Sequence, residues 1–278
     1  MALININYYS TVLGMNTNAV VSMPQKCDTF LSKGPRKTED GGIPVLWLLH
    51  GMGDDCTGWV RFTSIEKYAE ARGIAVVIPE VSSLCFYADM PKGLPYLTFI
   101  TKEFPQFIRE IFPTLSENPK YNFIAGCSMG GYGALKVALI NPERYSAVGC
   151  FSSGNFCDLE LPPVEYAPDF MKPIYVVPEV AFGVPTFKDS EGTCNDLRCL
   201  YEKNKGKRLP KIYQYAGTND WLIHASDKLA DYLRQRSAEG SYIYEKWDGE
   251  HNWKFWDEAL PKFLDSCGMK SLFTSEQA

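Results

Sequence analysis

One serine of the sequence stands in a context that favours nucleophilic chemistry. Ser128 is the central residue of a G-x-S-x-G pattern, which occurs once in the chain, as Gly126-Cys127-Ser128-Met129-Gly130. An apolar run over Tyr121–Ala125 predicts a strand before the pattern, and Gly130–Ile140 predicts a helix after it. Strand, tight turn and helix in this order form an elbow that exposes the serine hydroxyl above a sheet. The alternative interpretation is a structural turn with a buried serine.

A serine hydroxyl needs a base, and the chain offers three histidines, at positions 50, 224 and 251. His50 precedes the nucleophile and ends an apolar run, while His224 lies in a segment with a helical pattern. His251 follows the last predicted strand, within a short loop. Nucleophile, acid and base occur in that order along chains with a serine elbow. The order therefore predicts His251 as the base.

The predicted acid is Asp220, which follows the strand-like segment Lys211–Ala216. A carboxylate at the end of one strand can reach a histidine at the end of the next, where it orients the imidazole and stabilises its charged form. The alternative interpretation of Asp220 is a helix N-cap for the segment that follows. Asp196 and Asp248 are weaker candidates, because neither follows a predicted strand at the required place.

Acyl transfer also needs two N–H groups that stabilise the oxyanion. The first is expected from Met129, the residue after the nucleophile. The second is expected from the turn His50-Gly51-Met52-Gly53, a variant of the H-G-G-G type. Within that turn we favour the N–H of Met52, and Gly51 is the alternative donor. A plain tight turn without this role is the alternative interpretation of the motif.

The elements that must position these residues alternate between strand and helix patterns. Such alternation predicts parallel β-α-β units, hence a doubly wound, mostly parallel sheet of about eight strands. A polar stretch, Leu31–Gly42, is expected to form a surface hairpin loop. The predicted strands are Asn5–Ser10, Ala19–Met23, Pro44–Leu49, Ile74–Pro79, Tyr121–Ala125, Ala147–Phe151, Lys211–Ala216 and Ser241–Trp247. The predicted helices are Ser64–Arg72, Leu97–Phe112, Gly130–Ile140, Leu222–Arg236 and Trp253–Leu264.

The segment Asn155–Gly206 interrupts this alternation. It is rich in Pro, Gly and aromatic residues and has weak periodicity. Long irregular segments inside compact domains are usually functional. We therefore expect a single domain over residues 1–278, in which 155–206 is an insertion that caps the sheet.

Composition narrows the classes of function. The chain has 278 residues and a net charge of −5, and it lacks Lys/Arg blocks, so no nucleic-acid partner is expected. No apolar run is long enough to cross a membrane, and the first residues lack the pattern of a secretory signal, which suggests a cytoplasmic protein. The nine cysteines have no CxxC spacing and are expected to be free thiols. Neither a metal site nor a cofactor is expected.

Several motifs together resemble the Putative esterase (esterase D-like) family of α/β-hydrolases. They are LHGMGDD, GCSMGGYGAL, AGTNDW and GEHNWKFW, and the resemblance extends from about Asn5 to Leu264. The ending of GEHNWKFW, together with TSIEKYAEARGIAVVIPE and YADMPKG, is most similar to tributyrin and cinnamoyl (feruloyl) esterases. The resemblance implies the α/β-hydrolase fold, a Ser128, Asp220 and His251 triad, and oxyanion donors at Met52 and Met129. It also implies a small-molecule ester substrate and makes a homodimer or homotetramer plausible.

The substrate is less well defined by the sequence. Five aromatic residues could line an acyl pocket, although core packing is an alternative for each: Trp59, Tyr87, Phe182, Phe187 and Trp221. The favoured activity is hydrolysis of short-chain acyl or hydroxycinnamoyl (feruloyl) esters. The alternatives are a thioesterase of the S-formylglutathione type, an acyltransferase, and a binding module that has lost its chemistry.

Overall fold

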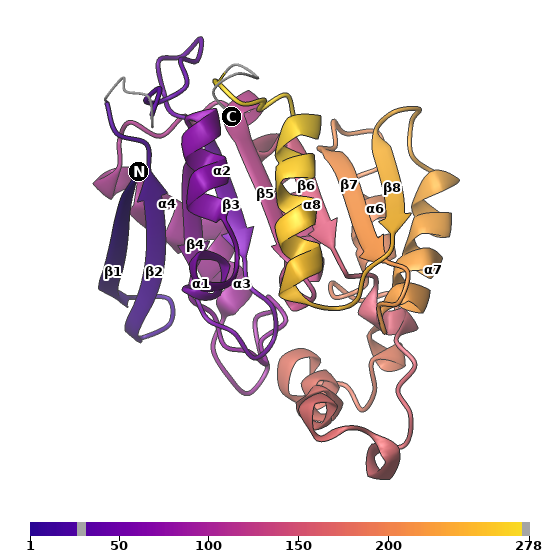
Figure 1. The fold of residues 1–278 in the computed structure, drawn as a ribbon. Coiled ribbons are helices and arrows are strands. Elements are labelled where there is room, and N and C mark those ends of the chain that lie inside the picture. Colours follow the sequence, from indigo (N-terminus) through magenta and orange to yellow (C-terminus); the bar gives the residue numbers. More distant parts are fainter. Residues whose placement is uncertain (27–31, 274–278) are drawn as a thin grey trace.

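The computed structural model describes residues 1–26 and 32–273, and its centre is one eight-stranded sheet (Figure 1). The strands lie side by side in the order β1-β2-β4-β3-β5-β6-β7-β8. Their bounds are β1 Ala2–Ser10, β2 Met15–Met23, β3 Val45–Leu49, β4 Ala75–Pro79, β5 Asn122–Cys127, β6 Ala147–Phe151, β7 Lys211–Gly217 and β8 Tyr242–Trp247.

The sheet is mostly parallel, as the sequence predicts. From β4 to β8 every neighbouring pair is parallel, whereas β1 and β2 form an antiparallel pair and β2 is antiparallel to β4. The carboxyl ends of the parallel strands therefore meet at one edge, which is where ligands bind in open α/β sheets. β1 and β2 begin earlier than predicted, at Ala2 and Met15. In β2 the added residues include the polar run Asn16-Thr17-Asn18, which carries no apolar signal.

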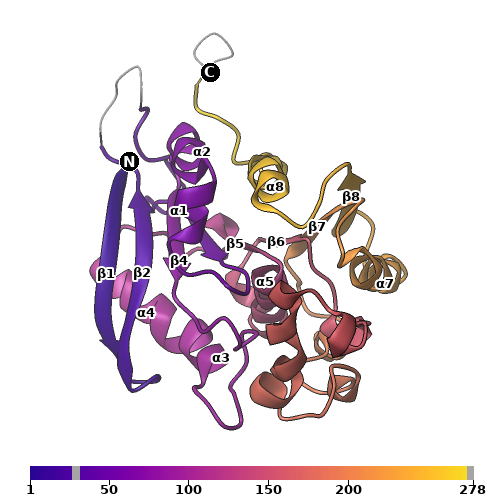
Figure 2. The same cartoon turned by 60° about the horizontal axis from the view of Figure 1, so that its bottom comes forward.

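Helices cover both faces of the sheet, and the side chains of each strand alternate between the two layers. In β3, Leu46 and Leu48 pack in one cluster with α2 (Ile65–Arg72) and α8 (Trp253–Ser266). The other residues of β3, which are Val45, Trp47 and Leu49, pack in the second cluster on the opposite face. Figures 1 and 2 show α2 and α8 on one side of the sheet. The side chains of α4 (Phe104–Ile111), α5 (Met129–Ile140) and α7 (Ile223–Arg234) belong to the cluster on the other.

Some helices differ from the prediction in extent. The predicted helix Leu97–Phe112 is a continuous helical run made of α3 (Tyr96–Thr98), a π-helical turn η1 (Phe99–Glu103) and α4. The short helix α1 (Gly58–Phe62) was not predicted, because five residues are too few for a periodic pattern.

The prediction of a hairpin loop over Leu31–Gly42 is wrong. Leu31 lies outside the described residues, and residues 32–42 form an irregular connection between β2 and β3. β4 lies between these two strands, antiparallel to β2 and parallel to β3. Polar, Gly- and Pro-bearing residues indicate that the chain leaves a strand, but they do not specify which strand pairs next.

The segment 155–206 consists mainly of short helical turns and lies beyond the carboxyl ends of the central strands (Figure 1). It also contains α6 (Leu197–Lys203), which was not predicted. Two residues of α5 hold it: the Tyr132 hydroxyl donates to the Asn195 carbonyl at 2.7 Å, and the buried Lys136 amine donates to the Asn195 side chain at 2.7 Å. Its action as a cap remains a prediction. The remaining turns are η4 Phe156–Asp158, η5 Val164–Tyr166, η6 Asp169–Val176, η7 Pro178–Phe182 and η8 Lys188–Ser190.

Candidate active site

Ser128 lies at the sharp turn between β5 and α5. Its φ is +54°, in the left-handed region that a residue with a side chain rarely adopts. Its backbone N–H donates to the carbonyl of Phe151 on the neighbouring strand at 2.9 Å. Strain of this kind persists where the surrounding structure fixes it, and it is common at functional sites.

Close packing of backbones makes this turn possible. A Cβ on Gly130 would lie 2.3 Å from the carbonyl oxygen of Leu49, and one on Gly126 would lie 2.4 Å from the backbone of Gly130. No L side chain fits at either position without a backbone shift. Close backbone contacts therefore explain why the motif has glycine at positions 126 and 130, and substituting either glycine tests this explanation.

We expect Gly130→Ala to destabilise the protein by about 3 kcal/mol, the upper end for overpacking, because the obstructing atoms are backbone. Because the shift would displace Ser128, any reaction that uses its hydroxyl should also slow about 10²-fold. Urea unfolding and ester hydrolysis measure the two effects. Gly240→Ala is the control: Gly240 has φ +72° and open space around it. That variant should lose only about 1 kcal/mol and keep its activity. Equal behaviour of the two variants would contradict the steric account.

Ser128, His251 and Asp220 form a continuous chain of contacts at the carboxyl edge of the sheet. His251 Nε2 lies 2.9 Å from Ser128 Oγ. His251 Nδ1 lies 2.9 Å from Asp220 Oδ1 and 3.1 Å from Asp220 Oδ2. The three residues come from the ends of β5, β7 and β8, so the parallel sheet brings together positions that are far apart in the chain.

The protonation states follow from the partners. Burial raises the pKa of Asp220, but its hydrogen bonds with His251 and with the Leu222 N–H outweigh burial, so the pKa lies below its usual value. An ionised carboxylate only accepts hydrogen bonds. His251 Nδ1 therefore carries the proton, and Nε2 is free to accept the hydroxyl proton of Ser128.

The other candidates from the sequence lie elsewhere. His50 is buried, and its ring contacts the backbone of Gly51 and Val81. His224 is exposed on α7. Asp196 caps α6, and Asp248 accepts a hydrogen bond from Asn219.

A hollow of about 350 Å³ opens over Ser128 and His251. One side is the turn after β3, and the other side is aromatic. The Trp253 and Trp256 rings lie 4.9 Å apart, and the Trp256 ring lies 5.2 Å from the His251 ring, each measured between centroids. The lining residues are Gly51, Met52, Gly53, Asp54, Phe62, Ser128, His251, Asn252, Trp253 and Trp256. Sequence reasoning missed Phe62, Trp253 and Trp256, although the two tryptophans lie in the same motif as the predicted base, GEHNWKFW.

The predicted acyl-pocket residues are placed differently. Trp59 and Tyr87 are completely buried, so the expectation that they line the pocket is wrong. Trp59 Nε1 donates to the carbonyl of Leu49, inside the core. Phe182 and Phe187 are also buried, in an aromatic cluster that includes Tyr132. The Trp221 ring lies 5.2 Å from that of His251, so Trp221 stays a candidate for substrate contact.

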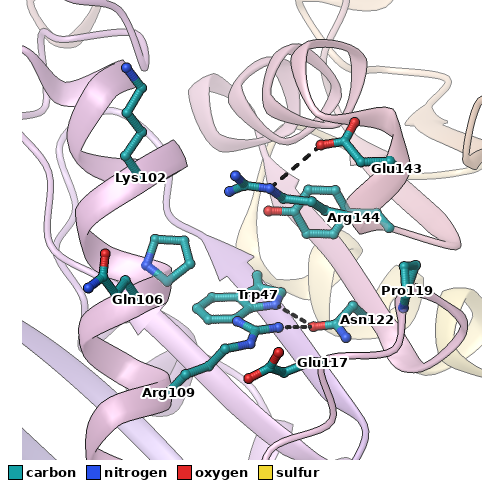
Figure 3. Close-up of a pocket in the computed structure, with 11 residues that line it drawn as sticks. Trp47, Lys102, Gln106, Arg109, Glu117, Pro119, Asn122, Glu143 and Arg144 are labelled. Atoms are coloured by element: carbon teal, nitrogen blue, oxygen red, sulfur yellow. Dashed lines mark hydrogen bonds and ion pairs between the residues drawn. The ribbon is translucent and has the colours of Figure 1, made fainter.

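A second hollow, of about 420 Å³, lies at the amino edge of the sheet (Figure 3). The guanidinium carbon of Arg109 lies 5.2 Å from the centroid of the Trp47 ring, and the same group donates a hydrogen bond to Asn122 Oδ1 at 2.9 Å. Asn122 begins β5, whereas Ser128 follows the other end of that strand. In the part of the chain that the structure describes, no Ser, Cys or His lines this hollow, so those residues offer no pair of nucleophile and base there. The smaller hollow, with Ser128 and His251, is therefore the candidate active site.

Residues 1–26 and 32–273 contain neither a metal-binding cluster nor a membrane-spanning helix. No group of three or more His, Cys, Asp or Glu residues there is arranged to hold a metal ion. No helix in that part of the chain has the length and apolar character needed to cross a membrane.

Comparison with known proteins gives consistent matches. The model of the family described as Putative esterase matches residues 20–266. An acetyl esterase of Caldicellulosiruptor saccharolyticus is 27% identical over 94% of this chain and 96% of its own length. Among solved structures, the fluorophosphonate-binding serine hydrolase F of Staphylococcus aureus is 32% identical, with a TM-score of 0.79 over 96% of this chain and 98% of that one. An S-formylglutathione hydrolase of the same organism is 31% identical, with a TM-score of 0.76 over the same shares of the chains.

Proposed function

The chain belongs to the Putative esterase family, and on that basis we propose that it hydrolyses small carboxylic esters through an acyl-enzyme formed on Ser128. The observation that carries the proposal is the unbroken contact from Ser128 Oγ through His251 to Asp220, which opens into the 350 Å³ hollow. Nucleophile, base and orienting acid in this geometry are the parts that acyl transfer requires.

The proposed reaction proceeds in two halves. Ser128 Oγ attacks the carbonyl carbon while His251 Nε2 takes the hydroxyl proton, and a tetrahedral oxyanion forms. The carbon–oxygen bond to the alcohol breaks, and the alcohol leaves with the proton from His251. Water then attacks the acyl-enzyme, His251 takes a proton from it, and the acid departs as Ser128 recovers its proton. Asp220 stays ionised and stabilises the imidazolium in both halves.

The proposed oxyanion donors are the N–H groups of Met129 and Met52. Met129 is the first residue of α5, where N–H groups have no partner within the helix and the helix dipole favours negative charge. Met52 lines the hollow beside Ser128. Met52 is preferred over Gly51 as the second donor, because a hydrogen bond from His50 to the Gly51 carbonyl fixes the direction of the Met52 N–H.

Short-chain acyl and hydroxycinnamoyl (feruloyl) groups are the proposed acyl groups. The aromatic side of the hollow, with Phe62, Trp253 and Trp256, supports an apolar or aromatic substrate group. The similarity to an acetyl esterase supports a small acyl group. Comparing kcat/KM on p-nitrophenyl acetate and methyl ferulate decides between them. No activity on either ester would contradict the proposal.

A thioesterase that acts on S-formylglutathione is the second candidate, because a solved hydrolase of that name is 31% identical over nearly the whole chain. A higher kcat/KM on S-formylglutathione than on the oxygen esters would favour it. Transfer of the acyl group to an added sugar, detected by product analysis, would favour an acyltransferase. A chain that binds these esters without turnover would be a binding module.

One carboxyl group in the hollow, that of Asp54, bears on this choice. Its side chain is half-buried, and burial raises its pKa above the usual value. It accepts a hydrogen bond from the Asp55 N–H at 2.9 Å. A negative charge there disfavours anionic substrates, and glutathione thioesters carry a net negative charge.

We therefore expect Asp54→Asn to raise kcat/KM for an anionic ester, p-nitrophenyl hemisuccinate, relative to p-nitrophenyl acetate. Removing one charge at close range is worth about 1 kcal/mol in water, or roughly fivefold. Asp55→Asn is the matched control, since Asp55 is exposed and its carboxylate is bound by Thr57. An unchanged ratio in Asp54→Asn would show that this carboxylate does not select substrates.

We also propose a cytoplasmic location and a homo-oligomeric assembly. Five of the described cysteines are buried free thiols, which suits the reducing cytoplasm. Recovery of the native protein mainly from the culture medium would contradict a cytoplasmic location. A homodimer or homotetramer is proposed from the family resemblance, and light scattering tests it, because a monomer at assay concentration would contradict it.

A further inference from the structure

A second histidine, His50, is completely buried directly after β3, and both of its ring nitrogens have backbone partners. Its Nε2 lies 3.3 Å from the backbone nitrogen of Val81. Its Nδ1 lies 2.9 Å from the carbonyl oxygen of Gly51. A backbone N–H can only donate, so Nε2 accepts from Val81. Nδ1 then carries the proton of a neutral ring and donates it to Gly51.

The second of these hydrogen bonds fixes one peptide plane. The Gly51 carbonyl and the Met52 N–H belong to the same peptide unit, and the described residues contain no cis peptide bond. In a trans peptide the two groups point in opposite directions. When His50 holds the carbonyl, the Met52 N–H must therefore point away from His50.

That peptide would otherwise have freedom to flip. Gly51, on one side of it, has no side chain to restrict the rotation, and the turn continues through Gly53, whose φ is +83°. The turn is also close to the nucleophile, since a Cβ on Gly51 would lie 3.5 Å from Ser128 Cβ. In a flipped peptide the Gly51 carbonyl would take the direction of the Met52 N–H, and its oxygen would repel a developing oxyanion.

His50 itself is held by a rigid set of contacts. Its carbonyl accepts a hydrogen bond from the Tyr87 hydroxyl at 2.9 Å. Tyr87 is completely buried, and its ring packs so closely on α5 that a Cβ on Gly133 would lie 2.2 Å from it. Phe86 and Tyr87 have φ of +44° and +49°, which is costly for aromatic residues. The backbone conformation that places Tyr87 beneath His50 is therefore maintained at an energetic cost.

We propose that His50 is a positioning residue for the oxyanion hole, whose neutral imidazole locks the Gly51–Met52 peptide so that the Met52 N–H faces the reacting carbonyl. The proposal rests on the esterase function proposed above and adds a role to a histidine that lies outside the triad. It also explains the choice of Met52 over Gly51, because the N–H of the Gly51–Met52 peptide is the one whose direction the ring sets.

Two variants separate the two ring nitrogens. His50→Asn places an amide nitrogen near the position of Nδ1 and can still donate to Gly51. His50→Gln reaches the position of Nε2 and can still accept from Val81, but it leaves the Gly51 carbonyl unheld. Each variant therefore retains one of the two native hydrogen bonds in a side chain of similar polarity, and each serves as the control for the other.

We expect His50→Gln to lose about 10²–10³ in kcat, the effect of one lost oxyanion donor, while KM changes by less than about twofold. Binding of a boronic acid that mimics the tetrahedral intermediate should weaken in parallel. His50→Asn should keep kcat within about tenfold of wild type, at a similar denaturation midpoint. Equal losses of kcat in the two variants, or a loss that follows stability, would overturn the proposal.

A measurement on the unaltered protein covers the case in which a variant does not fold. The 15N shifts of the three labelled histidine rings report which nitrogen carries the proton, and His50 should be in the Nδ1–H form. The Nε2–H form would overturn the proposal. These outcomes are distinct from failure of the esterase function, which would appear as a wild type whose activity Ser128→Ala does not change and would overturn both proposals.

Discussion

Ser128→Ala is expected to lose on the order of 10⁶ in kcat on p-nitrophenyl acetate, because no other group in the hollow can form the acyl-enzyme. Among the described residues that line it, Ser128 alone has a hydroxyl, and His251 Nε2 lies 2.9 Å from its Oγ. Steady-state and single-turnover kinetics measure the loss. Ser146→Ala is the control, since Ser146 is similarly half-buried but lies at the amino edge of the sheet. That variant should retain wild-type rates.

His251→Ala should lower kcat about as much as Ser128→Ala does. A nucleophile and base that act as a unit give losses that do not add, so Ser128→Ala combined with His251→Ala should be no slower than either single variant. Losses that multiply in the double variant would mean that the two residues act in separate steps, which would contradict the proposed mechanism.

The second large effect is expected at Asp220. Asp220→Asn should lower kcat about 10⁴-fold with little change in structure. The asparagine side chain can donate to Nδ1 as well as accept from it, and in the donating orientation it holds the ring with the proton on Nε2. That ring cannot accept the proton of Ser128.

Asp248→Asn is the matched control for this prediction. The sequence offers Asp248 as an alternative acid, but in the structure it accepts a hydrogen bond from Asn219, whereas Asp220 contacts His251. Asp248→Asn should therefore stay within about threefold of wild type in kcat, a change of under about 1 kcal/mol. A full loss of activity in Asp248→Asn with little loss in Asp220→Asn would contradict the proposed triad. Both variants are measured with saturating p-nitrophenyl acetate.

Much of the fold could be predicted because it depends on local patterns. The apolar run before Ser128 and the Gly- and Ala-rich run after it have different periods, and they correspond to β5 and α5. The chain has three histidines, which leaves few candidates for the base. The order of strands along the chain then placed Asp220 and His251 at the same edge as Ser128, and the distances agree with that placement.

What the sequence did not reveal depends on packing between distant segments. Trp59 and Tyr87 were expected in the pocket, but they fill the core under the turn after β3, where both donate hydrogen bonds to backbone carbonyls. Aromatic residues suit core and pocket equally, so composition alone cannot separate the two locations. Phe62 illustrates the opposite error, because it lies far from Ser128 in the chain yet lines the hollow.

The most direct measurement of the central claim is covalent labelling of the intact protein with a fluorophosphonate. We predict one label per chain, recovered by peptide mass mapping on the peptide that contains Ser128, with loss of esterase activity in proportion to labelling. Ser128→Ala, treated in the same way, should remain unlabelled. A label on another residue, or equal labelling of Ser128→Ala, would contradict the assignment of Ser128 as the nucleophile.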